Sequence, residues 1–294
     1  MISSFSRRLP VLFLCLMVTA CSSLTVSQQK ATKTYARATT TLGQFGETEF
    51  TGLRSGIISM NQMRFVLRKD QGMQQADFYI TAGLNDVNAR VTAARALASY
   101  GELLQSLLSK DVSDDLDDAA ATFADNAASA LGDEFGDDKK SAIQTLVEGL
   151  GSFWVERERG KALKAIITDY QPTVKQLVQL LENDLTLDGK SGMMRAYLSA
   201  ARALKNESYT IVNAGDEYSY ADRNIAAAAL LQAMQAQEHV DEIVPRASQA
   251  LQALRQSNDA LVRVLDDKNY ATGDIKEYAK QIRDLVKVYN ALSA

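Results

Sequence analysis

The chain of 294 residues contains little cysteine, proline or histidine. Both cysteines, Cys15 and Cys21, lie near the N-terminus, so the rest of the chain has no disulfide and must be stabilised by packing. Beyond residue 20 the only prolines are Pro172 and Pro245. Because proline breaks helices and alanine favours them, an alanine-rich chain with so little proline is expected to be all-α.

The scarcity of histidine and free thiols also limits the chemistry. A single histidine, His239, excludes a His-rich zinc site and an HExxH helix. No GxSxG motif is present, and no pair of carboxylates is distinguished from the many helical acids. We therefore predict no catalytic, metal or cofactor site, no small-molecule substrate and no enzymatic activity. Glu238 and Glu242 flank His239 at helical spacing, and we interpret it as a surface histidine among charges.

The charge balance is mildly acidic. Lys and Arg number 32 against 36 Asp and Glu, for a net charge of −4. Removal of Arg7 and Arg8 with residues 1–20 takes it to about −6. Such a chain has no electrostatic basis for binding nucleic acid.

The first 20 residues have the layout of a secretory signal. Arg7 and Arg8 supply the basic start, Leu9–Val18 is an apolar run, and small residues precede Cys21. The apolar run is about half the roughly 20 residues that a permanent transmembrane helix needs. We therefore expect residues 1–20 to be a cleaved signal peptide.

The sequence Val18-Thr19-Ala20-Cys21 resembles the lipobox of bacterial lipoproteins. The resemblance implies cleavage before Cys21 and attachment of acyl chains to its thiol. Two or more acyl chains hold a protein stably on a membrane, whereas one binds reversibly. The residue after the cysteine is Ser22 rather than Asp, which in this family implies transfer to the outer membrane. We expect a chain anchored there through Cys21 and facing the periplasm.

Hydrophobic spacing divides the remaining chain into helices. We interpret residues 21–34 as the lipidated cysteine and a polar tether, and residues 35–294 as one helical domain. Residues 35–80 are punctuated by glycines and suggest short helical pieces. Apolar residues three and four apart predict a helix from about residue 77 to Leu108 and another ending at Leu131, before Gly132.

The second half of the chain predicts longer helices. Residues 137–187 suggest about 50 helical residues, roughly 75 Å in length, although the apolar stripe loses phase at Glu156–Lys161. That segment is either a hinge or a solvated charged face. After a returning helix at 194–211, the strongest pattern alternates steps of four and three, which is a coiled-coil seam. Its members are Val240, Val244, Ala247, Leu251, Leu254, Asn258, Leu261 and Leu265.

Pro245 lies inside this seam without breaking its phase, which predicts one kinked helix. A last helix follows at 275–289. Long helices joined by short turns predict an elongated antiparallel helical bundle with coiled-coil-like helices.

Two features admit competing interpretations. Asn258 is the polar member of the seam and either fixes helix register or lies half exposed at a bundle edge. The acidic run from Asp111 to Asp118 places oxygen ligands where an EF-hand begins. Leu116 and Thr122, however, occupy the positions that require Gly and Glu. We interpret the run as acids at a helix N-terminus, which their charge favours.

A lipid anchor and long seams without a catalytic set favour a scaffold, adaptor or accessory subunit that acts by protein–protein contact. Its envelope partner is unknown. Two alternatives remain open at this stage. One is a membrane-active bundle that resembles pore-forming proteins, and the other is an enzyme that acts on the cell wall.

Overall fold

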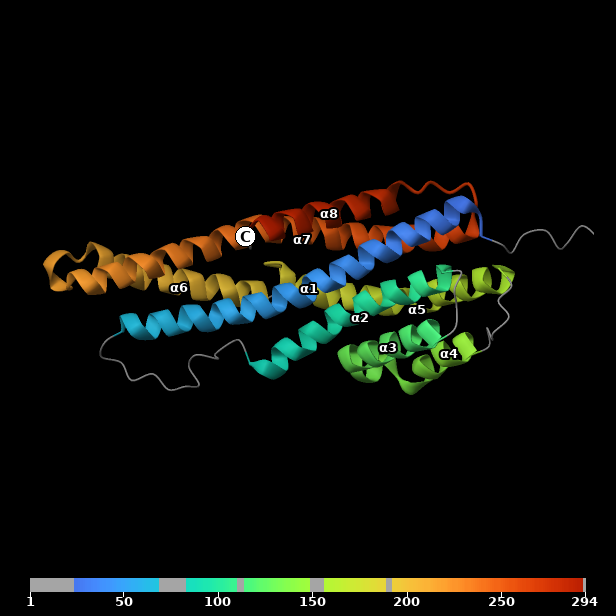
Figure 1. Ribbon diagram of the computed structural model, residues 1–294, viewed down its shortest axis with the longest axis horizontal. Coiled ribbons are helices and arrows are strands. Elements are labelled where there is room, and N and C mark those ends of the chain that lie inside the picture. The colour runs from blue at the N-terminus through green and yellow to red at the C-terminus, as the bar shows by residue number, and fades with distance from the viewer. Residues whose placement is uncertain (1–23, 69–82, 110–113, 149–155, 189–191, 293–294) are drawn as a thin grey trace, which may run out of the picture.

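The computed structural model describes residues 24–68, 83–109, 114–148, 156–188 and 192–292, and these residues contain only helices and their connections (Figure 1). The predicted all-α bundle is confirmed, and the molecule is elongated. The α-helices are α1 (Val26–Leu67), α2 (Leu84–Leu108), α3 (Asp114–Leu131), α4 (Asp137–Glu148), α5 (Glu156–Leu185), α6 (Met193–Asn213), α7 (Tyr220–Asp266) and α8 (Gly273–Leu292). Two 3₁₀ turns, η2 (Gly132–Phe135) and η3 (Gly215–Glu217), complete the described elements.

Helix α1 is one continuous helix of 42 residues. Thr25 caps its first turn and forms a capping box with Gln28, so the start of the helix is specified by sequence. The prediction of short pieces over residues 35–80 is therefore wrong for residues 35–67. Residues 26–34, which the sequence assigned to the tether, already belong to the bundle, and Ala31 and Thr32 are buried.

Gly43 of α1 is a close-packing position rather than a helix break. An added Cβ at Gly43 would lie 2.5 Å from the carbonyl oxygen of Ala94 and from the amide nitrogen of Ala98 in α2. At Gly101 of α2 it would lie 2.5 Å from the carbonyl oxygen of Ala36 in α1. These glycines allow two antiparallel helices to pack backbone against backbone instead of interrupting a helix.

Helix α7 is the longest described helix, with 47 residues and a length of about 70 Å. Helices α5 and α6 follow each other along it in the opposite direction. The Lys164–Asp266 and Arg255–Glu182 ion pairs and the Lys205–Gln237 hydrogen bond mark this antiparallel register. The predicted seam lies in α7 and faces the core, and Pro245 lies inside the unbroken helix as predicted.

The predicted 50-residue helix is wrong, because the Tyr170 hydroxyl of α5 donates to the carbonyl of Lys139 in α4 at 2.7 Å, whereas one straight helix would hold these residues about 46 Å apart. The phase loss at Glu156–Lys161 coincides with the start of α5, so it marks a helix boundary. The next residues, Ala162 and Leu163, are already buried.

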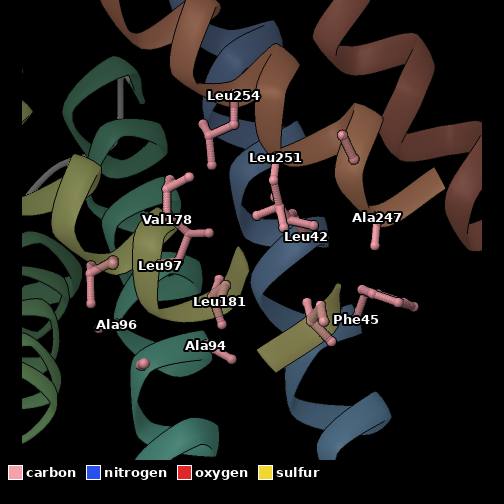
Figure 2. Packing of buried hydrophobic residues seen from close by; sticks show 14 of the residues in the cluster. Leu42, Phe45, Ala94, Ala96, Leu97, Val178, Leu181, Ala247, Leu251 and Leu254 are labelled. Atoms are coloured by element: carbon pink, nitrogen blue, oxygen red, sulfur yellow. The ribbon is translucent and has the colours of Figure 1, made fainter. Parts of the chain in front are cut away.

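The core forms where α1, α2, α5 and α7 meet. Leu42 of α1 lies near Leu251 of α7, and Leu97 of α2 lies near Val178 of α5 (Figure 2). Helices α3 and α4 pack at one side, where Phe123, Phe135 and Tyr170 form a ring cluster. Helix α8 covers only the C-terminal half of α7 (Figure 1). In the half of the molecule that holds the N-terminal half of α7, the helices are α1, α6 and α7, and α8 does not reach them.

Candidate interaction surface

Cys21 and the acidic run from Asp111 to Asp118 are the first candidate residues to be placed in the structure. Cys21 lies outside the described residues, as do Asp111 and Ser113 of the acidic run. Within α3, Leu116 is buried while Asp115, Asp117 and Asp118 are exposed, so the acids line the outside of the first turns. Among the described residues, no three His, Cys, Asp or Glu side chains are grouped to hold a metal ion.

His239 is not a surface histidine, and this interpretation is wrong. Its Nε2 lies 2.8 Å from Oε1 of Glu49, a carboxylate of α1 that is 2% exposed, while His239 itself is 18% exposed. Its imidazole ring packs edge-on against Tyr197 of α6 and Tyr289 of α8. Four helices thus meet at one buried acid and one histidine.

The surroundings of this pair are those of a packed core. Burial, followed by the nearby charge of Glu49, raises the pKa of Tyr197 to about 12, so its hydroxyl stays protonated at neutral pH. Neither of the two surface hollows described below is lined by Glu49 or His239. The pair joins α1 to α7.

Asn258 is buried, which excludes the half-exposed alternative. The Tyr35 hydroxyl donates to its Oδ1 at 3.1 Å, and its Nδ2 donates to the carbonyl of Gln171 at 3.3 Å. The amide therefore links α7 to α1 and α5 at once, and burial without these partners would be costly. This geometry supports a role of Asn258 in helix register.

A hollow of about 290 Å³ lies among α1, α2, α3 and α5. Its walls are mostly apolar, but Arg90 and Asp184 at its side are paired with each other at 2.7 Å. Asp184 also accepts the backbone N–H of Met193, at the start of α6. Because the cation is neutralised within the protein, the hollow offers no free charge to an anionic ligand.

Exposed apolar side chains are concentrated at one end of the molecule, where α1 and α6 end and α7 begins (Figure 1). Seven of the nine large apolar side chains exposed in the described residues gather there. We call this group the distal surface; it consists of Phe65, Val66, Tyr209, Tyr220, Ile225, Leu231 and Met234. Single exposed apolar residues are ordinary, whereas a concentrated set marks an interaction site.

A groove continues the distal surface along α6 and α7. It has a volume of about 480 Å³, and its apolar floor includes Leu231 and Met234, which are 58% and 52% exposed. Glu238, Asp241 and Glu242 of α7 line the groove further along, opposite Lys205 of α6. Its chemistry is thus apolar at the distal end and acidic toward the middle of the molecule. Such a groove suits a helix better than a small ligand.

The distal surface is not evident from the sequence alone. Its apolar members come from three helices, and only the fold brings them together. Glu49 was likewise not singled out, because its partner lies 190 residues away.

Comparisons with known proteins provide no assignment. No family model, no curated protein and no solved structure matches the chain.

Proposed function

We propose that this protein is an outer-membrane lipoprotein that acts by protein–protein contact rather than by catalysis. Acylated Cys21 is its anchor, and the distal surface is the part that meets a partner. The observation that carries this proposal is the concentration of exposed apolar side chains at one end of the bundle. The lipobox resemblance of residues 18–21 supports the anchor.

The geometry of α1 separates the proposed anchor at one end of the molecule from the distal surface at the other. Helix α1 begins at Val26, five residues after Cys21, and ends beside the distal surface. Its 42 residues span about 63 Å. An anchor at Cys21 therefore leaves the distal surface at the far end of a rigid helix, where it can reach a partner away from the lipid.

Charge favours a protein over a lipid at the distal surface. Glu238, Asp241 and Glu242 lie along its groove, and Asp216 and Glu217 are exposed at the nearby turn. Anionic lipids attract basic clusters, not acidic ones. In the described part of the chain, no helix has the length and apolarity that crossing a membrane requires.

Cys21→Ser is expected to move the protein from the membrane fraction to the soluble fraction of cells, because it removes the thiol that carries the acyl chains. Fractionation followed by immunoblotting measures this. Cys15→Ser is the matched control, since it replaces the other cysteine of the chain and should leave the protein in the membrane. A Cys21→Ser protein that stays with the membrane contradicts the anchor.

A photoreactive amino acid at Leu231 is expected to form adducts with a protein partner in intact cells. The same amino acid at Gln252 is the matched control, because Gln252 is also exposed on α7, and it lies five turns along the face of Met234. Mass spectrometry of the adducts identifies the partner. Equal adducts at both positions, or none at either, contradict the role of the distal surface.

A further inference from the structure

Helix α7 carries a second coiled-coil seam on its outer face. Its members alternate steps of four and three, as the buried seam does. They are Tyr220, Asn224, Ala227, Leu231, Met234, Glu238 and Asp241, and all are exposed. Leu231 and Val240 are nine residues apart, about two and a half turns, so the outer seam lies opposite the buried one. The buried seam is filled by the bundle, and the outer seam is covered by none of the described helices.

We propose that a second copy of this chain occupies the outer seam, with the two α7 helices antiparallel. The inference rests on the proposed function, because it names the partner of the same surface. In antiparallel coiled coils, each layer pairs the first apolar heptad position of one helix with the second position of the other. Placing Leu231 beside Met234 of the second copy makes the two central layers apolar.

Charge selects this direction. In the antiparallel register, Asp241 lies beside Asn224 of the second copy, where the amide can donate to the carboxylate. The acidic turn 238–242 then faces the turn 223–227, which holds the cation Arg223. A parallel pair would instead place Glu238 and Asp241 beside their own copies, and like charges in contact disfavour association. The charges of the outer seam are therefore complementary in an antiparallel pair of α7 helices and not in a parallel pair.

The pairing has a consequence for the anchors. Gln28 of α1 donates through Nε2 to the carbonyl of Val264 at 2.8 Å, so α1 starts beside the end of α7 that is remote from the outer seam. Two antiparallel copies therefore have their chain starts at opposite ends of the assembly.

Disulfide trapping tests both the pairing and its direction. The full chain in mild detergent, with Cys15→Ser and Cys21→Ser, has no other cysteine, so one new cysteine reports one position. Chains with Asn224→Cys, mixed with tagged chains with Asp241→Cys, are expected to form a mixed dimer under oxidation. Neither chain alone should cross-link efficiently, because two copies of residue 224 would lie about 25 Å apart. Gln252→Cys, beyond the seam members that meet in the pair, is the control and should form no disulfide-linked dimer.

Light scattering on the same cysteine-free chain gives the second measurement. We expect a dimer that becomes a monomer when Leu231→Lys and Met234→Lys are combined, with at least a tenfold rise in the dissociation constant. Circular dichroism confirms that the exposed substitutions leave the helices intact. Cross-linking between identical positions overturns the antiparallel direction, and a monomer at all concentrations overturns the self-pairing. If a different protein is then trapped at Leu231 in cells, the proposed function stands with another partner. If nothing is trapped, both fail.

Discussion

Gly43→Ala is expected to lower the free energy of unfolding by about 1–3 kcal/mol, the range for overpacking a tight interface. The new Cβ would meet backbone atoms of Ala94 and Ala98 at 2.5 Å, and backbone cannot move aside as a flexible side chain can. Relief requires α1 and α2 to separate along their shared face, which loosens the core around Leu42 and Leu97. Urea unfolding followed by far-UV circular dichroism measures the loss.

Gly52→Ala in the same helix is the matched control, and the expected change has the opposite sign. An added Cβ at Gly52 has no atom within 4 Å, so only helix propensity changes. Alanine is favoured over glycine inside a helix by about 0.5–1 kcal/mol, which should stabilise the protein by that amount. Equal effects at Gly43 and Gly52 would show that the close crossing of α1 and α2 is not needed for stability.

These two glycines also show why α1 could not be predicted from sequence. Both cost helix propensity equally, and a single sequence gives no sign that one of them lies under a neighbouring backbone. In the sequence alone, the glycines of residues 35–67 therefore indicate a series of helix breaks. What decides the helix is tertiary contact with Ala94 and Ala98, far along the chain.

The seam of α7 was predictable because its evidence is local. Val240, Ala247, Leu254 and Leu261 repeat every seven residues, and their burial follows from that pattern alone. Asn258 was correctly identified as a polar seam residue, but its partners Tyr35 and Gln171 depend on the fold. The outer seam was also present in the sequence. Its two acids, Glu238 and Asp241, are typical of a solvated face.

His239 was misplaced for a related reason. Its sequence neighbours Glu238 and Glu242 are charged, so the local pattern indicates exposure. The helix turns His239 toward α1 instead, where it contacts the buried Glu49, and its ring packs against Tyr197 and Tyr289. A buried carboxylate needs a partner, and in this chain the only histidine supplies it.

His239→Phe is expected to cost about 1–3 kcal/mol of stability, the range for leaving a buried hydrogen-bonding group, here the Glu49 carboxylate, without its partner. Phenylalanine keeps an aromatic ring against Tyr197 and Tyr289, so the loss reports the lost partner more than lost packing. Urea unfolding at neutral pH measures it. The exposed Lys175–Asp259 pair is the control, with both side chains nearly half exposed. Lys175→Met should cost about 0–1 kcal/mol.

Combining His239→Phe with Glu49→Met should recover most of the loss, because replacing both members of a buried pair by apolar side chains is often close to neutral. This recovery distinguishes a Glu49 carboxylate left without its partner from poor packing of the introduced phenylalanine ring. If the introduced phenylalanine ring simply packs badly, Glu49→Met leaves the deficit in place, and the two substitutions add. A double mutant no more stable than His239→Phe alone would therefore contradict the pairing. A recovered stability would identify Glu49–His239 as the contact that makes an acid tolerable where α1, α6, α7 and α8 meet.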